Sequence, residues 1–467
     1  MKNICVRNVI TILFLFIFKF TYTQIVYDNK LEFEIKFINT PTIVSFKEKG
    51  FLVYTNRNEN AEPFIIEKYD ADLKKVKEIE LDIKSGSKLY HKFENNDDLH
   101  LLFIIPYGNF VYYKINASTL EVQTYEGKIS ITTLIQSIAS VGNYTYLALE
   151  KSRGIELLKI DLRSGEMTNI EIQIDDIKDK KLHITRMLIA DGSKDIIVFI
   201  DSYKFSDFTF YILPIKEAKN IGSIIKIEYE FAEDTHIIPL TAASLGNDEY
   251  ILTGYYTVDY TNPQGIFLCK TYNTQTIFFK PYKLREFKEF SANYKPPIIN
   301  GSNKNGEDNV RYNIKIAQNP IIQSGDQFVF YGDFFEQVLE ANNSMKPGEP
   351  TAYLVGHSYE QSLIAGFDQN GNLLWDKSYP LSGFLSKNIV SSITVFNPSN
   401  PLQLLVPGYG VHNKITINSL TGITQEEPIY GMGNYLYHDD KNYYFSGFSE
   451  HLSNKQGIFF IAKGHLE

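Results

Sequence analysis

Apolar residues recur along this chain in short runs that have the period of a β-strand rather than that of a helix. Examples with alternating or continuous apolar positions are Leu99 to Ile105, Tyr144 to Leu149, Ile196 to Ile200 and Phe328 to Tyr331. Runs of four to eight such residues, bounded by polar turns, are typical of strands. Helical periodicity is nearly absent, so the pattern predicts an all-β chain.

Polar turns separate these strands at regular intervals. They begin at Asp70, Asn116, Asp161, Asp368 and Asn418, with weaker copies near Pro214 and at Tyr272-Asn273. Successive turns lie 45 to 58 residues apart, except for one step of 96 residues. Asp or Asn at the start of a turn and Gly at a position of positive φ are what a tight hairpin needs, so we interpret these motifs as structural.

Units of this length with three or four strands each indicate a β-propeller rather than a two-sheet sandwich. The count gives eight blades, or seven if the 96-residue step is misdivided. The last unit, 442–463, stops after its third strand. Near the N-terminus, Leu31, Phe33, Ile35 and Phe37 alternate with charged residues. We therefore expect this N-terminal strand to complete the last blade and close the ring, which removes an exposed sheet edge.

One hairpin carries a family resemblance. Residues 365–375 read Ala-Gly-Phe-Asp-Gln-Asn-Gly-Asn-Leu-Leu-Trp, and Asp161 to Gly165 has a related form. The first resembles the D-x-N-G-x-L-L-W hairpin of bacterial propeller repeats, and the whole chain is similar to uncharacterised secreted bacterial β-propeller proteins. The resemblance implies the fold and says little about function, because propellers serve as enzymes, receptors and scaffolds alike.

The N-terminal segment predicts export. Lys2 and Arg7 precede an apolar run from Val9 to Phe18, and Thr21 and Thr23 are small residues before a cleavage point ahead of Gln24. This order is that of a secretory signal peptide, and the apolar run is too short to span a bilayer. Cleavage would leave a single propeller domain, 24–467, in the periplasm, at the cell surface or outside the cell. A retained N-terminal anchor is the alternative.

The net charge limits the expected partners, and the cysteine count limits the possible disulfides. The chain has 46 basic and 55 acidic residues, and loss of residues 1–23 would change the net charge from −9 to −12. A nucleic acid or an anionic membrane is therefore not an expected partner. After cleavage only Cys269 remains, so no internal disulfide can form. We expect Cys269 to be a buried apolar residue.

The sequence contains no recognisable motif of a catalytic, metal or cofactor site. Gly356-His357-Ser358-Tyr359-Glu360 lacks the second glycine of a nucleophile elbow. No zinc signature occurs, and Asp368 to Asn372 lacks the bidentate glutamate of a calcium loop. Quinone-cofactor propellers dock their blades with many tryptophans, whereas this chain has only Trp375. The sequence assigns no catalytic residue, no metal and no cofactor.

A candidate binding face follows from propeller geometry. Loops between second and third strands, together with the blade connections, open on one face, and the tight hairpins open on the other. The two longest irregular stretches, 283–311 and 332–361, belong to the first face, where we expect insertions. Long loops in compact domains are often functional. The candidate ligand-binding residues on this face are Tyr255, Tyr256, Asp259, Tyr260, Asp333, Glu336, His357, Tyr359, His412 and His451.

Three functions remain open, the third being a purely structural component of the cell envelope. The leading hypothesis is a secreted or envelope-associated, non-enzymatic binding or scaffold protein, monomeric, with an unknown protein or glycan ligand. The alternative is a glycan-active enzyme whose paired carboxylates come from different blades, because general acid–base cleavage needs two carboxyls about 5–10 Å apart. The second-to-third-strand loops are 15% aromatic against 14% for the chain. Loop composition therefore gives no sign of a platform for stacking sugars.

Overall fold

The computed structural model covers the whole chain. It describes residues 23–466 except 37–40, 56–63, 96, 131–132, 152–153, 175–180, 205–206, 231–234, 258–261, 295–297, 303–307, 311–314, 318, 320, 342–351, 387–392, 398–400, 408–410, 419–421, 431–433, 439–441 and 453–455. The predicted signal segment, 1–23, lies outside these residues apart from Thr23.

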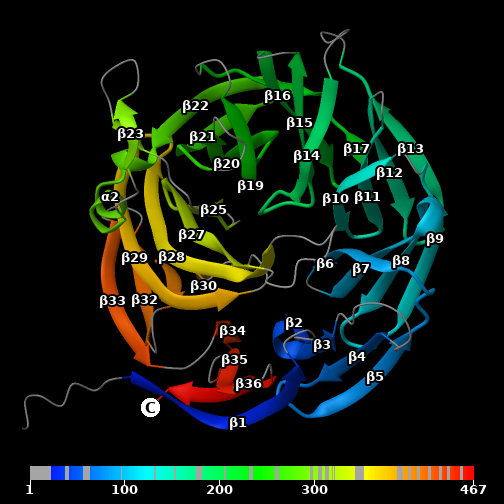
Figure 1. Ribbon diagram of the computed structural model, residues 1–467. Helices are drawn as coiled ribbons and strands as arrows, with labels where there is room; N and C mark the ends of the chain where they lie inside the picture. Colours follow the sequence, from blue (N-terminus) through cyan, green and yellow to red (C-terminus); the bar gives the residue numbers. More distant parts are fainter. Residues whose placement is uncertain are drawn as a thin grey trace, which may run out of the picture.

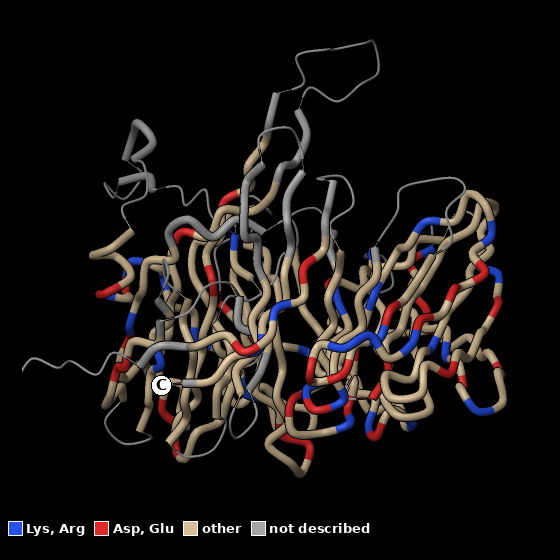
Figure 2. Tube along the Cα trace, turned by 90° about the horizontal axis from the view of Figure 1, so that it is seen from below, with Lys and Arg blue, Asp and Glu red and all other residues tan. Residues whose placement is uncertain are grey.

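The described strands form a closed ring of eight blades (Figure 1). Each blade is an antiparallel sheet whose first strand lies nearest the centre of the ring and whose fourth strand lies outermost. The all-β, eight-bladed propeller predicted from the sequence is confirmed, and the seven-bladed alternative is wrong. Seen edge-on, basic and acidic residues are interspersed around the ring (Figure 2).

The first four blades follow one another along the chain. Blade 1 contains β2 (Pro41–Ser45), β3 (Phe51–Thr55), β4 (Phe64–Tyr69) and β5 (Lys75–Leu81); blade 2 contains β6 (Lys88–Glu94), β7 (Asp98–Ile105), β8 (Asn109–Asn116) and β9 (Val122–Lys128); blade 3 contains β10 (Leu134–Val141), β11 (Tyr144–Glu150), β12 (Ile155–Asp161) and β13 (Met167–Ile172); blade 4 contains β14 (Lys181–Ile189), β15 (Ile196–Lys204), β16 (Asp207–Lys216), β17 (Asn220–Ile221) and β18 (Ile225–Ile227). Short 3-10 turns, η1 (Lys47–Lys49) and η2 (Pro106–Gly108), link strands within blades 1 and 2.

The other four blades include the chain's longest strands and its two ends. Blade 5 contains β19 (His236–Gly246), β20 (Glu249–Thr257), β21 (Gly265–Tyr272) and β22 (Gln275–Lys283); blade 6 contains β25 (Lys315–Ile316), β26 (Ile322–Ser324), β27 (Gln327–Ala341), β28 (Ala352–Asp368) and β29 (Leu373–Ser386); blade 7 contains β30 (Thr394–Asn397), β31 (Leu402–Pro407), β32 (Val411–Asn418) and β33 (Gly422–Tyr430); blade 8 contains β34 (Asn434–His438), β35 (Tyr443–Leu452), β36 (Gln456–Leu466) and β1 (Thr23–Lys36).

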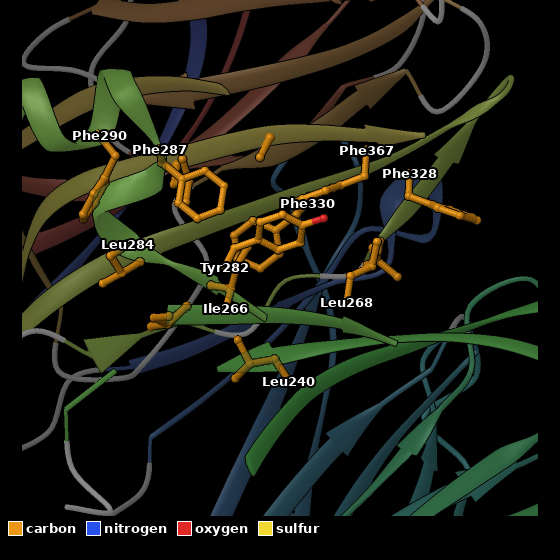
Figure 3. Packing of buried hydrophobic residues seen from close by; sticks show 14 of the residues in the cluster. Leu240, Ile266, Leu268, Tyr282, Leu284, Phe287, Phe290, Phe328, Phe330 and Phe367 are labelled. Carbon is orange, nitrogen blue, oxygen red and sulfur yellow. The ribbon is translucent and has the colours of Figure 1, made fainter. Parts of the chain in front are cut away.

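The hydrophobic core lies between the blades, because alternate residues of a strand face opposite neighbours. In β15, Ile196, Val198 and Ile200 pack with residues of blade 3, whereas Ile197 and Phe199 pack with residues of blade 5. Eight clusters of buried residues correspond to the eight interfaces between blades. Figure 3 shows the cluster between blades 5 and 6. Cys269 is fully buried in such a cluster, as predicted.

The predicted hairpin turns connect third and fourth strands, and their polar residues hold the backbone. The Asp70 carboxylate accepts hydrogen bonds from the backbone N–H groups of Asp72 and Lys74, and Asp368 accepts from Asn370 and Asn372 in the same way. Gly371 adopts a φ of +75°, which favours glycine. The weaker copy near Pro214 is displaced, since Pro214 lies in β16 and the turn begins at Glu217.

In several blades, a tyrosine hydroxyl donates a hydrogen bond to a turn of the next blade. Tyr146 of blade 3 donates to the carbonyl of Ala218 in blade 4 at 3.0 Å, and Tyr444 of blade 8 donates to that of Ala71 in blade 1 at 3.0 Å. The same contact links Tyr125 to Leu162 and Tyr282 to Gly371. The ring of tyrosine adds to the apolar interface, and its hydroxyl satisfies a turn carbonyl that would otherwise lack a partner.

Strand β1 closes the ring, as predicted. It pairs antiparallel with β36 from Ile25 through Lys36, and Thr23 and Gln24 pair parallel with the end of β33 in blade 7. Leu31 and Phe33 pack into the cluster between blades 8 and 1. Lys463 forms an ion pair with Asp72 at 2.6 Å across the same junction.

The described parts of the two long stretches at blade 6 form regular structure where the sequence predicted loops. The first begins with η3 (Leu284–Glu286) and α2 (Lys288–Asn293), whose Leu284, Phe287 and Phe290 are fully buried, and continues with β23 (Ile298–Ser302) and β24 (Asp308–Val310). The Asp376 carboxylate of β29 accepts the N–H groups of Lys288 and Glu289. Most of the second stretch, 332–361, belongs to the extended strands β27 and β28.

The register of β1 makes a testable prediction. Leu31→Asp places a charge in the cluster between blades 8 and 1, so we expect urea unfolding to show a loss of about 2 kcal/mol or more. Glu32→Ala, at the exposed neighbouring position, should change the free energy of unfolding by less than about 0.5 kcal/mol. Equal effects of the two substitutions would contradict the register.

Candidate functional site

The residues proposed from the sequence are spread over blades 5 to 8. In blade 6, Asp333, His357 and Tyr359 are buried, and the His357 and Tyr359 rings contact Phe335 with centroids 5.1 and 5.4 Å away. The N–H of Ile393 in the connection to blade 7 approaches the Asp333 carboxylate at 3.4 Å. These three side chains therefore lie in packed interfaces, because β27 and β28 continue through the region where loops were expected.

The remaining predicted residues do not gather at one point. Tyr256 is buried and Tyr255 is half-buried, both near the end of β20, and His412 is buried against Phe445 with centroids 5.4 Å apart. Glu336 is exposed as a whole, but partial desolvation of its carboxyl raises its pKa, and the charge of Glu360 adds to that rise. Asp259 and Tyr260 lie outside the described residues, as does the side chain of His451, which belongs to β35.

A different set of polar residues meets between blades 3 and 4. Nδ1 of His183 lies 2.7 Å from Oε2 of Glu150, and His183 is directly opposed to Asp201 in the ladder between β14 and β15. Residues opposed in this way have Cβ atoms about 4.5–5.5 Å apart. We call Glu150, His183 and Asp201 the mouth cluster. It brings together Glu150 of blade 3, the His183 ring that contacts it, and Asp201, which opposes His183 within blade 4.

The mouth cluster lies on the face where second-to-third-strand loops open. Glu150 is the last residue of β11, Asp201 lies near the end of β15, and His183 lies near the start of the inner strand β14. Strand periodicity explains the direction of Glu150: Tyr146 and Ala148 pack toward blade 4, so Glu150, two residues on, follows them.

The Glu150 carboxylate is buried and well supplied with donors. Nε2 of Gln136 lies 2.8 Å from Oε2, and Nζ of Lys181 lies 3.8 Å from Oε1. The Glu150 carboxylate accepts a hydrogen bond from Gln136. For it to accept from His183 as well, the ring proton must lie on Nδ1, which leaves Nε2 as the second hydrogen-bonding atom of the ring. Glu150 thus fixes the tautomer and orientation of His183.

The Asp201 carboxyl has a different environment. Its Oδ1 is buried and has no hydrogen-bond partner among the described residues. Burial raises the pKa of Asp201 to about 6; the Glu150 charge adds to the rise and His183 opposes it. The site therefore combines a carboxyl group surrounded by hydrogen-bond donors, Glu150, with a carboxyl group whose raised pKa makes it keep its proton more readily, Asp201.

The described part of the chain shows neither a candidate metal site nor a candidate membrane-spanning helix. No group of three or more His, Cys, Asp or Glu side chains there could hold a metal ion. None of the helices among these residues is long and apolar enough to cross a bilayer.

Part of the mouth cluster adjoins loops that propeller geometry places on the candidate face. Glu150 is the last residue of β11 and Asp201 lies near the end of β15, and both strands lead into second-to-third-strand loops. The candidates predicted from the sequence lie mostly in loops, which excludes strand residues such as Glu150 and His183. Neither residue lies in a recognisable motif, because the partners come from strands that only the ring brings together.

Comparisons with known proteins leave the family open. No family model and no curated protein matches the chain. A structure from an analysis of two prolyl endopeptidases is 10% identical over 89% of this chain, with a TM-score of 0.42. Prolyl oligopeptidase B from Galerina marginata is 9% identical over 93%, with a TM-score of 0.41. This chain matches only 51% and 55% of those two chains.

A third similar structure is a dihydro-heme d1 dehydrogenase. It is 9% identical over 85% of this chain and 75% of its own, with a TM-score of 0.37. At this level of similarity, none of these structures assigns an activity to the chain.

The pKa of Asp201 predicts how stability depends on pH. Because its folded-state pKa lies above the unfolded value near 3.8, stability is lost as pH rises from about 4 to about 6. Asp201→Asn should therefore raise the free energy of unfolding at pH 8 by up to about 3 kcal/mol and change it little at pH 4. Urea unfolding at both pH values tests this. The exposed Asp326→Asn is the control, and a gain that is the same at both pH values would contradict the assignment.

Proposed function

We propose that this protein is an exported bacterial β-propeller that binds a ligand at the mouth of its ring, on the face of the second-to-third-strand loops. The observation that carries the proposal is the mouth cluster. Glu150 is buried there and His183 and Asp201 are partly buried, although the apolar cluster between blades 3 and 4 packs the interface without them. Burying such groups is costly, so their retention favours a role in recognition.

Export is supported by the sequence of residues 1–23 and is compatible with the role of β1. Cleavage ahead of Gln24 would leave Ile25 through Lys36, the part of β1 that pairs with β36, in the mature chain. The exported protein would then keep a closed ring. Its location would be the periplasm, the cell surface or the medium, and the bacterial origin rests on the resemblance of the Asp368 hairpin.

A second function has one specific observation in its favour. Glu150 and Asp201 are carboxyl groups of different blades, as a glycan-cleaving enzyme built on this fold would need. In such an enzyme Asp201 would protonate the leaving oxygen, and Glu150 with His183 would take a proton from the attacking water. Release of reducing ends from a polysaccharide, lost in Asp201→Asn, would favour this enzyme over a binding protein.

A thermal-melt panel tests the binding proposal. The mature chain is heated alone, with soluble neutral polysaccharides, with peptidoglycan fragments and with a peptide library, since a ligand selective for the native state raises the melting temperature. We expect one class of probe to raise it and Glu150→Gln to lose at least half of that rise. Glu126→Gln, an exposed glutamate of β9, is the matched control.

A flat panel would contradict ligand binding by any of these classes. A rise that survives both Glu150→Gln and His183→Gln would contradict the placement at the mouth cluster.

A further inference from the structure

Three of the exposed large apolar side chains lie on the same face as the mouth cluster. Tyr90 of β6 is 52% exposed and Leu134, the first residue of β10, is 60% exposed. Tyr107, in η2 between the second and third strands of blade 2, is 83% exposed. All three lie at the ends of elements that open on the face of the mouth cluster. Most large apolar side chains of the described residues are buried, so this grouping needs a reason.

Tyr90 is fixed rather than loosely exposed. Its hydroxyl donates to the carbonyl of Ile135 in blade 3 at 2.5 Å, so the ring spans the inner edges of blades 2 and 3. The next residue of β10, Gln136, donates to Glu150, and Leu134 is directly opposed to Glu150 in the ladder. A half-exposed aromatic ring and the mouth cluster therefore belong to one continuous set of contacts.

Tyr107 provides a second aromatic ring that lies outside the core. Its φ of +70° is unusual for a residue other than glycine and costs about 1 kcal/mol or more. The loop is anchored, because the carbonyl of Gly108 accepts the N–H of Ile129 in the connection to blade 3 at 2.8 Å. The strain therefore presents the ring to solvent at a defined place.

Each of two glutamates at the site has a lysine beside it. Lys181 lies beside Glu150, and Lys151 pairs with Glu156. These two carboxylates thus carry no surplus negative charge that would attract a cationic ligand. What remains is a set of hydrogen-bond acceptors and donors, the carboxylates, the Gln136 amide and the His183 ring, next to an aromatic face.

We propose that Tyr90, Gln136, Glu150 and His183 form a binding site for a neutral saccharide, with Tyr107 as a further aromatic contact for a longer chain. The apolar C–H face of a sugar ring would pack on Tyr90, while its hydroxyls donate to the Glu150 carboxylate, which His183 orients, and accept from the Gln136 amide. This inference rests on the proposed function and names the ligand class of the same site.

Affinity electrophoresis tests the saccharide proposal. The mature chain is run through gels that contain laminarin, xylan, galactomannan or starch, and we expect at least one of them to retard it. Tyr90→Ala should weaken binding about tenfold, and Gln136→Ala should weaken it as well. Tyr90→Phe keeps the ring and should stay within about threefold of the wild type, which separates stacking from the hydroxyl contact and from misfolding.

Tyr272→Ala is the matched control. Tyr272 is 46% exposed at the end of β21, on the opposite face, and its loss should leave the retardation unchanged. Absence of retardation by all four polysaccharides, or equal losses in Tyr90→Ala and Tyr272→Ala, would overturn the saccharide proposal. If peptides raise the melting temperature in the thermal panel through Glu150 while these gels stay negative, ligand binding stands and the ligand class is wrong.

Discussion

The pairing of β1 with β36 is the constraint on which the rest of the structure depends. Every blade buries both of its faces against neighbours, so an open ring would expose two apolar blade faces and an unpaired strand edge. Closure by an N-terminal strand makes the first blade interface equivalent to the others: Leu31 and Phe33 supply apolar contacts, and Tyr444 donates to the Ala71 turn. The fixed ring then sets where strand ends meet at its mouth.

Tyrosine side chains explain how the blades dock although the whole chain has only one tryptophan. A tyrosine from one blade fills apolar space and carries its hydroxyl to a turn carbonyl of the next, as at Tyr146 and Ala218. At Ala71, Leu162 and Gly371 the accepting carbonyl lies in a tight hairpin that an Asp side chain folds. The repeat turns and the abundance of tyrosine are thus two parts of one docking arrangement. The exception is Trp375, which packs in the cluster between blades 6 and 7.

The fold could be predicted because its determinants are local. Two-residue periodicity, the Asx turns and the alternation around Leu31 each reside in a few consecutive residues, and they gave the blades and the closing strand. The site could not be predicted in the same way. Glu150, His183 and Asp201 are separated in sequence and carry no motif. His357 and His412 were expected in loops, but β28 and β32 extend past them and bury both. Counting aromatic loop residues also missed Tyr90, which lies on an inner strand.

A ligand held by blades 2 to 4 at the ring mouth would protect the starts of their inner strands from exchange. Hydrogen–deuterium exchange of the mature chain, with and without a mixture of the neutral polysaccharides, tests it most directly. We predict slower exchange in peptides that cover 88–91, 134–137 and 181–184, the starts of β6, β10 and β14, with no change at the turn 70–74. Protection confined to blades 6 to 8, or none anywhere, would contradict the account.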